Sequence, residues 1–463
     1  NTQDTRAGQD RLQETTPVAA ATHIDQRPFT RAYGGYLLAL LITALVLAHL
    51  SWTSYHDAIR HAELSSTGLA RVNALALDTA LKTADMLLTQ AAEMLAHHSD
   101  DPVALQQATG LPREWFEHLP RETLRSPAVC SVLRPDGFLS QHGFTITELN
   151  TGNGTLISNA YTDLLHRFFQ GSPVMEGFGG TWYRPVQDVI ALVHKTVGHQ
   201  RGRLGLFLQK EEHAMILGWE ERYIQQARLA VKLFCDAGFD AQLMDDRHLE
   251  MARGKLFFKR GQQRHRVSGL VLVSSSATLL DRPKDLARHP YLLGLRAGDA
   301  PIIKPLAAVM FEKSAMPLLR ELHVLPRPLG GGMQLSMQDT DTLHPEGAAT
   351  YRLHREGLVL KRAFEGKDTI VGCATSGREW NHHVERALRH GGYVVQEFAE
   401  MPQAVLPMVL GKRIEWLPVR VEMSPFLVGG RFSGAIVRYA PLQTGPVYSP
   451  PPPDMALTTV VGT

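Results

Sequence analysis

The chain has 463 residues, enough for about two or three subdomains, each with its own core. Its 48 basic and 46 acidic side chains leave a net charge of +2, which argues against a general nucleic-acid or polyanion binder. The three cysteines, Cys130, Cys235 and Cys373, form no CxxC pair, so neither a disulfide framework nor a zinc site is indicated. Partners therefore have to be inferred from local sites.

The N-terminal part combines a polar tail with a long apolar segment. Residues 1–30 have mixed charge and no periodicity, which predicts disorder. Residues 33–52 within the helical region 31–110 are apolar over about the length that crosses a bilayer. Basic residues flank this segment equally on both sides, so its orientation is undetermined. The alternative is that residues 33–100 form packing helices of a soluble enzyme.

Residues 111–300 have the texture of an α/β domain. A helix is predicted over 219–237, and strands are predicted over 204–208, 241–244, 255–259 and 269–273. Alternating strands and helices favour a largely parallel sheet covered by helices. We expect this region to hold the metal-binding strands near its start and a substrate-binding domain after them.

Residues 301–445 continue as strands around one well-marked helix. Ser376 and Glu379 form a capping box, and Gly391 ends the helix that follows. Strands are predicted over 358–361, 369–373 and 393–398, and an antiparallel pair over 416–423 and 431–439. Residues 446–463 contain a proline run, which is more typical of a spacer than of a recognition motif.

The most informative spacing for chemistry is Arg134-x-Asp136 followed by Glu148-x-Asn150. Glu148 and Asn150 are two residues apart, so on a strand they share a face. A hairpin or a second strand could bring Asp136 beside them. Two carboxylates and an amide oxygen suit Mg²⁺ when phosphates and water supply the other ligands, and Arg134 suits the same phosphates. The alternative from spacing alone is a surface hairpin with scattered charges.

A resemblance to a known family covers roughly residues 120–445. Residues 358–438 look like the nucleotide-binding half of an ATP-grasp ligase, with a lysine strand ending at Lys361, a linker at Gln396-Glu397 and a later strand that ends at Arg438. In ordinary ATP-grasp enzymes the metal-binding motif follows these elements, whereas here it precedes them. The order is similar to that of circularly permuted, glutathionylspermidine synthase-like members. Lys313 resembles their second nucleotide lysine.

The resemblance implies an α/β ATP-grasp fold and an ATP- and Mg²⁺-dependent ligase that joins a carboxylate to an amine or thiol through an acyl phosphate. It implies small-molecule or peptide substrates and no nucleic acid. The roles that it implies are metal binding by Asp136, Glu148 and Asn150, nucleotide binding by Lys313, Lys361, Lys367, Gln396 and Glu397, and stabilisation of transferred charge by Arg134 and Arg438.

Departures from the family leave other functions open. The usual glycine-rich loop is reduced to Gly366 and Lys367, and no amidase domain with a catalytic cysteine is present. One alternative is a fold that binds ATP without turnover. Another is a membrane-anchored sensory or binding protein, based on residues 33–100. The implied location is the cytoplasm, with anchoring to the inner membrane through residues 33–52 as a further expectation.

Overall fold

The computed structural model describes part of the 463-residue chain. The described residues are 132–140, 143–150, 181–198, 203–207, 221–272, 289–303, 312–321, 327–330, 333–363, 369–410, 413–429, 431–446, 456–459 and 461–462, with a few single residues between 101 and 167. The chain divides into two compact units, Asn1–Gly68 and Leu69–Thr463, and all described residues belong to the second. Their mixed helices and sheets confirm the predicted α/β class.

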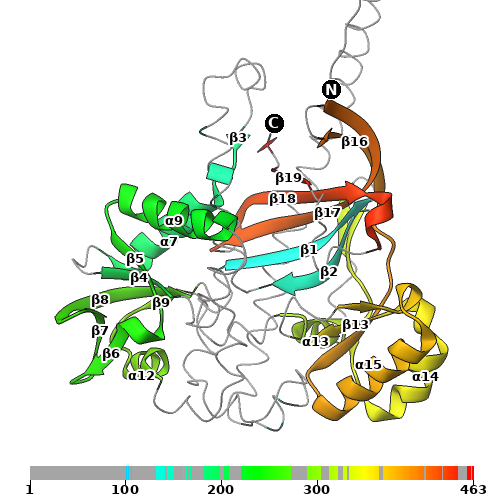
Figure 1. The fold of residues 1–463 in the computed structure, drawn as a ribbon, viewed down its shortest axis with the longest axis horizontal. Helices are drawn as coiled ribbons and strands as arrows, with labels where there is room; N and C mark the ends of the chain where they lie inside the picture. The colour runs from blue at the N-terminus through cyan, green and yellow to red at the C-terminus, as the bar shows by residue number, and fades with distance from the viewer. Residues whose placement is uncertain are drawn as a thin grey trace, which may run out of the picture. The chain divides into compact units, whose positions relative to one another are not determined.

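A mixed sheet of eight strands carries the predicted metal-binding motif, in the part of the chain that the structure describes. Figure 1 shows its central strands side by side, and the order along the sheet is β10-β11-β2-β1-β17-β18-β19, with β16 also paired to β17. The bounds are β1 Val132–Ser140, β2 Gly143–Asn150, β10 Arg327–Gly330, β11 Met333–Met337, β16 Gln403–Leu410, β17 Arg413–Val428, β18 Arg431–Pro441 and β19 Ala456–Thr459. The predicted antiparallel pair of 416–423 with 431–439 is confirmed as β17 and β18.

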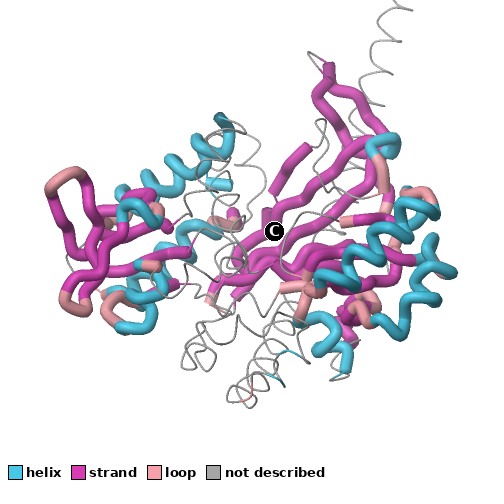
Figure 2. The backbone as a smooth tube through the Cα atoms, turned by 60° about the horizontal axis from the view of Figure 1, so that its bottom comes forward, coloured by secondary structure: helices cyan, strands magenta, loops and turns pink. Residues whose placement is uncertain are grey.

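A second, antiparallel sheet carries the predicted nucleotide lysine. Its order is β12-β15-β13-β14, with bounds β12 Thr340–Thr342, β13 Leu358–Arg362, β14 Ile370–Val371 and β15 Tyr393–Glu397. Helices α14 (Ala348–Leu353) and α15 (Gly377–His390) cover it, as Figure 2 shows in cyan against magenta strands. Trp380, Val384 and Ala387 of α15 pack on Leu360 of β13 and on Tyr393 of β15. This apolar contact holds α15 against the strand that carries Lys361.

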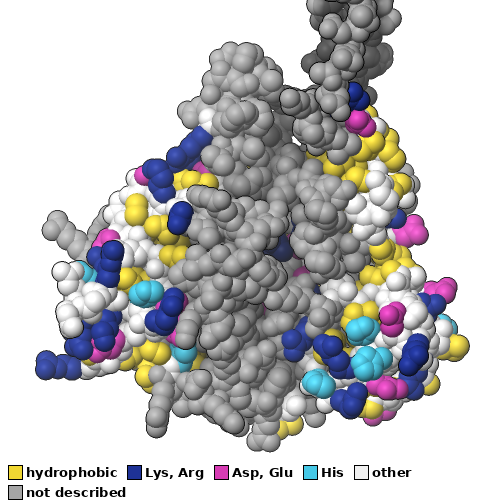
Figure 3. Space-filling view, in the orientation of Figure 1, with side chains coloured by type: hydrophobic (Ala, Val, Ile, Leu, Met, Phe, Trp, Pro, Cys, Tyr) yellow, Lys and Arg dark blue, Asp and Glu magenta, His cyan; other side chains and the backbone are white. Residues whose placement is uncertain are grey.

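The ends of α15 agree with the sequence prediction. The Ser376 hydroxyl accepts from the Glu379 amide at 3.3 Å, the Glu379 carboxylate accepts from the Ser376 amide at 3.4 Å, and Gly391 ends the helix with a positive φ of 66°. The outer face of the helix carries exposed basic, acidic and histidine side chains (Figure 3). His382 is exposed on this face.

A third sheet has the predicted parallel centre with an antiparallel extension. Strand β4 (Arg203–Phe207) pairs in parallel with β5 (Asp240–Met244) and β8 (Gln263–Leu272), and β9 (Ile302–Ile303) pairs in parallel with β8. Strands β6 (Leu249–Ala252) and β7 (Lys255–Arg260) extend β8 in the antiparallel sense. The helices of this region are α7 Pro185–Val197, α9 Glu221–Asp236 and α12 Pro290–Ala297.

The largest described core joins the third sheet to the first. Buried side chains along one stripe of α7, among them Val189 and Val193, pack with Phe234 of α9 and with Val428 of β17. A stripe at helical spacing is what an amphipathic helix buries between two layers. The remaining described elements are α13 (Ala315–Glu321), the short pair β3 (Thr181–Trp182) and β20 (Val461–Gly462), and the 3₁₀ helices η2 Asp246–His248, η4 Pro345–Gly347, η5 Arg355–Gly357, η6 Gly372–Ala374 and η7 Leu442–Thr444.

The predicted membrane segment falls outside this description. Residues 33–52 and the polar tail 1–30 are not among the described residues, and the same holds for Lys367. No helix within the described part of the chain has the length and apolar character needed to cross a membrane.

Candidate active site

A β-bulge at Thr147 decides which side chains of β1 and β2 share a face. Four residue pairs next to the hairpin turn match one to one, ending with Gly137 opposite Ile146. The next pair is Asp136 opposite Glu148, so Thr147 is an extra residue on β2. Directly opposed residues of an antiparallel pair lie on the same face, and a one-residue shift exchanges the faces. Without the bulge, Asp136 would oppose Thr147 and Glu148 would point away from it.

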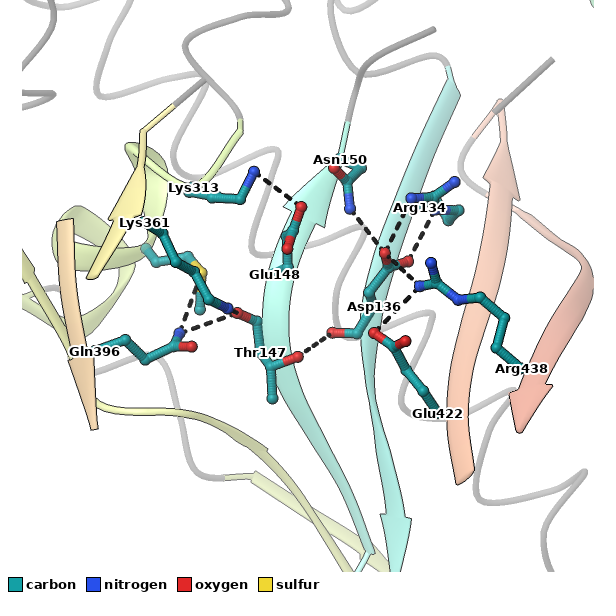
Figure 4. A network of polar contacts seen from close by, with 11 residues as sticks. Arg134, Asp136, Thr147, Glu148, Asn150, Lys313, Lys361, Gln396, Glu422 and Arg438 are labelled. Carbon is teal, nitrogen blue, oxygen red and sulfur yellow. Dashed lines mark hydrogen bonds and ion pairs between the residues drawn. The ribbon is translucent and has the colours of Figure 1, made fainter. Parts of the chain in front are cut away.

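The bulge also aligns the outer pair of the motif. Arg134 lies opposite Asn150, two residues along each strand from the pair of Asp136 and Glu148. All four side chains therefore project from the same side of the hairpin, as Figure 4 shows. The predicted juxtaposition of Asp136 with Glu148 and Asn150 is confirmed, although the i, i+2 spacing alone does not produce it.

Gly137 is the residue that lets the two strands approach beside the bulge. A Cβ atom at this position would lie 2.2 Å from the Thr145 carbonyl oxygen and 2.9 Å from Cζ of Phe144. We expect Gly137→Ala to lower the free energy of unfolding by about 1–3 kcal/mol, since overpacking forces backbone shifts. Urea unfolding measures the change. Gly357→Ala is the control, because a Cβ there meets nothing within 4 Å, and equal stability of both variants would contradict the expectation.

Asp136 lies at the centre of a cluster of basic and amide groups. Arg134 binds it through two nitrogens, with Nε 2.8 Å from Oδ1 and Nη2 2.9 Å from Oδ2. Arg438 of β18 donates Nη2 to Oδ2 at 2.8 Å, and the Asn150 amide nitrogen donates to the same oxygen at 3.0 Å. Burial raises the pKa of Asp136, but the two arginines more than offset it and hold the pKa below its ordinary value. Asp136 is therefore an ionised carboxylate that is positioned by Arg134 and Arg438.

Glu148 is paired with a lysine from another part of the chain. Nζ of Lys313, just before α13, lies 2.8 Å from Oε1 of Glu148, and the Lys313 side chain is only 1% exposed. Burial raises the pKa of Glu148, while Lys313 and Lys361 lower it, with a net shift below the ordinary value. The two lysines that the sequence places 48 residues apart thus act on one carboxylate.

Lys361 and Gln396 meet at the bulge. Nζ of Lys361 and Nε2 of Gln396 each lie 3.0 Å from the Thr147 carbonyl oxygen. Burial lowers the pKa of Lys361, and the neighbouring Glu148 carboxylate opposes that shift. The adjacent Glu397 is exposed, lines the pocket and accepts from the Gln338 amide at 3.3 Å.

Glu422 is a site residue that sequence reasoning missed. It lies on β17 opposite Arg438, with Oε1 3.1 Å from Nη2 of that arginine. If β17 and β18 paired from their turn without a register shift, Val421 would lie opposite Arg438. A register shift between Pro425 and Leu427 brings Glu422 there instead. The acidic residue within the predicted strand was the available signal, but the shift has no local sequence mark.

The protonation of Glu422 predicts a pH dependence of stability. Burial raises its pKa from 4.5 to about 7, although Arg438 opposes the shift. As the pH rises from 4.5 to about 7, the unfolded chain releases this proton and the folded chain keeps it. In metal-free buffer the free energy of unfolding should therefore fall over this window, by on the order of 3 kcal/mol, and level off above it.

Urea unfolding at several pH values checks this expectation. Glu422→Gln should flatten the slope between pH 4.5 and 7, because the amide does not titrate there. Glu400→Gln is the control, since Glu400 is exposed and lies outside the pocket lining. A slope that Glu422→Gln leaves unchanged would show that other groups cause it.

These residues line one pocket that has both charged and apolar side chains. The apolar side chains include Val359, Phe398 and Met401. The polar lining holds the predicted residues Arg134, Asp136, Glu148, Asn150, Lys361, Gln396, Glu397 and Arg438, together with Glu422. Lys313 reaches this group through Glu148 (Figure 4). An apolar pocket with convergent polar groups at one end is a common form of a ligand site.

The donor set fits a magnesium ion that arrives with anionic phosphates. Within the described part of the chain, no group of three or more His, Cys, Asp or Glu side chains is placed so that it could hold a metal ion without other ligands. Asp136 and Glu148 are instead bound to Arg134, Arg438 and Lys313. Phosphate oxygens are partners for these basic groups, and carboxylates and an amide oxygen are the ligands that Mg²⁺ accepts from protein. Metal binding by Asp136, Glu148 and Asn150 stays a prediction.

Sequence comparison places the chain in no family. No family model matches it, and no curated protein matches its sequence.

Solved structures of synthetases are similar to it at low identity. A glutathione synthetase-like effector from Globodera pallida, in its apo form, has a TM-score of 0.44 and 11% identity, over 77% of this chain and 84% of that chain. D-alanyl-alanine synthetase A from Vibrio cholerae has a TM-score of 0.26 and 13% identity, over 48% of this chain and 67% of that chain. Because both TM-scores lie below 0.5, the chemistry of the site has to carry any functional conclusion.

Proposed function

We propose that the chain is an ATP- and Mg²⁺-dependent ligase that joins a carboxylate to an amine. The observation that carries the proposal is that one pocket is lined by Asp136, Glu148 and Asn150, by Arg134, Arg438 and Lys361, and by apolar side chains. Phosphoryl transfer needs positioning and charge neutralisation more than covalent help. A pocket that holds both acidic and basic groups supports that chemistry, and its apolar side chains suit a purine.

Each basic group has a distinct place in the proposed reaction. Lys361, from β13, lines the pocket and would bind the phosphates as a point charge. Arg134 and Arg438 flank Asp136 and would stabilise negative charge on the transferred phosphoryl group. Lys313 would exchange Glu148 for a phosphate oxygen. Asp136, Glu148 and Asn150 would hold Mg²⁺, which would supply positive charge against the negative charge that develops during transfer.

The order of the elements supports an ATP-grasp ligase of the circularly permuted type. Strands β1 and β2, which carry the acidic motif, precede β13 and β15 in the chain, yet all four strands contribute to one pocket. The resemblance that covers residues 120–445 has this order. Lys367, in the reduced glycine loop, belongs to the proposal as a further phosphate ligand.

A panel of carboxylic acids and amines, with ATP and MgCl₂, tests the proposed function. We expect ADP and phosphate in equal amounts during repeated turnover, which requires an acid and an amine together. The terminal phosphoryl group passes to the carboxylate, ADP leaves, and the amine then displaces phosphate to form the amide. Tight ATP binding without ADP formation under any combination would favour a nucleotide-binding protein, and the absence of ATP binding would contradict the proposal.

A further inference from the structure

The Thr147 carbonyl is held by side chains of another sheet and not by a neighbouring strand. As the bulge residue, Thr147 has no directly opposed residue on β1, and its hydroxyl donates to the Asp136 carbonyl at 3.2 Å. On the other side of β2, the parallel partner β11 ends its pairing at Met337 opposite Ile146. Beyond that point, Lys361 and Gln396 donate to the Thr147 carbonyl oxygen from β13 and β15. The position of this carbonyl, and with it the conformation that turns Glu148 toward Asp136, therefore depends on these two donors.

The orientation of the Gln396 amide follows from its partners. The Thr147 carbonyl can only accept, so the nitrogen of Gln396 must face it. The Thr340 hydroxyl donates to the Gln338 carbonyl at 2.8 Å, and so it accepts from Gln396 across a second 2.8 Å contact. An amide nitrogen carries two hydrogens, and both are used in these bonds. No N–H of Gln396 is left to donate to a base.

A bound phosphate can draw Lys361 away from the Thr147 carbonyl but not Gln396. Lys361 is charged and lines the pocket, so under the proposed function a phosphate competes with the Thr147 carbonyl for its ammonium. Gln396 is neutral, 3% exposed and anchored by Thr340, which is 1% exposed. When Lys361 turns to a phosphate, Gln396 is the donor that keeps the Thr147 carbonyl, and with it the bulge, in place.

We propose that Gln396 is a positioning residue for the metal site and not a ligand of adenine. It acts through the Thr147 carbonyl, which keeps Glu148 and Asn150 on the face of Asp136. This inference rests on the proposed function for the identity of the ligands. It differs from the adenine contact that the family resemblance implies for Gln396, and the two roles have different consequences for a variant.

The test is Gln396→Met, which keeps the side-chain length and removes both donors. The affinity for AMP-PNP in EDTA should stay within about twofold of the parent chain. The Mg²⁺ concentration for half-maximal turnover should rise about tenfold or more, because loss of a group that orients metal ligands typically weakens metal binding by that factor. Gln334→Met is the control, since Gln334 is exposed on β11, next to the same strand, and should change neither value. Weaker AMP-PNP binding with an unchanged Mg²⁺ requirement would overturn the inference and favour the adenine contact.

A second measurement separates this inference from the proposed function. Amide hydrogen exchange of residues 144–150 should be faster in Gln396→Met than in the parent, and it needs no ligand. Unchanged exchange there would also overturn the inference. If the parent binds no nucleotide, the proposed function fails, and exchange still decides whether Gln396 holds the bulge. Thr340→Val, which removes the anchor of Gln396, should change the exchange in the same direction and serves if Gln396→Met does not fold.

Discussion

Lys361→Met is expected to weaken ATP binding about a hundredfold, because methionine keeps the volume of the side chain and removes the charge that phosphate oxygens bind. Lys361 is 8% exposed and lines the pocket. Its loss also removes one of the two donors to the Thr147 carbonyl. Isothermal titration with AMP-PNP in EDTA measures the effect without any contribution from the metal.

Lys259→Met is the matched control for this change. It removes the same charge from β7 of the third sheet, where the Lys259 side chain is 51% exposed and lies 3.9 Å from Glu250. We expect the affinity for AMP-PNP to stay within about twofold of the parent, since exposed ion pairs contribute little. Equal losses in both variants would mean that net charge, and not the pocket, governs nucleotide binding.

Asp136→Asn should lower turnover without weakening nucleotide binding, in contrast to Lys361→Met. Turnover is expected to fall about a thousandfold, since the amide removes one negative ligand charge and one anchor of the two arginines. Binding of AMP-PNP in EDTA should be at least as tight as in the parent, because the phosphates no longer meet the carboxylate. Any increase in AMP-PNP affinity that Mg²⁺ gives the parent should be lost in the variant.

Asp240→Asn controls for the substitution itself. Asp240 is 57% exposed and pairs with Arg203 at the start of β5, away from the pocket lining. Its turnover and Mg²⁺ dependence should match those of the parent. A variant of Asp136 that retains more than about a tenth of the parent's turnover would contradict its place among the metal ligands.

The part of the fold that the sequence predicts best is the part with local signals. The helix after Ser376 has its capping box, its apolar stripe and its terminal glycine within 16 residues, so its bounds follow from neighbouring side chains. Strand positions such as β13 and β15 also follow from short apolar runs. Their pairing and register are different, because they depend on residues far apart in the chain.

In the candidate site, too, local spacing is predictable from the sequence and strand register is not. The spacing of Glu148 and Asn150 predicts one shared face, but the bulge that turns this face toward Asp136 depends on Gly137 and on the end of β11. A second register shift, near Pro425, brings Glu422 to the site and hides it from sequence reasoning. One-residue irregularities leave the hydrophobic alternation on either side almost unchanged and exchange the faces at the site.

The most direct measurement of the central claim is a crystal structure of the chain with AMP-PNP and Mg²⁺. The proposed function predicts the triphosphate at Lys361, Arg134 and Arg438, and the purine against Val359 and Met401. It also predicts Mg²⁺ between the phosphates and the oxygens of Asp136, Glu148 and Asn150. Nucleotide bound elsewhere on the chain, or no bound nucleotide at saturating concentration, would contradict the claim that this pocket is the site of an ATP-dependent ligase.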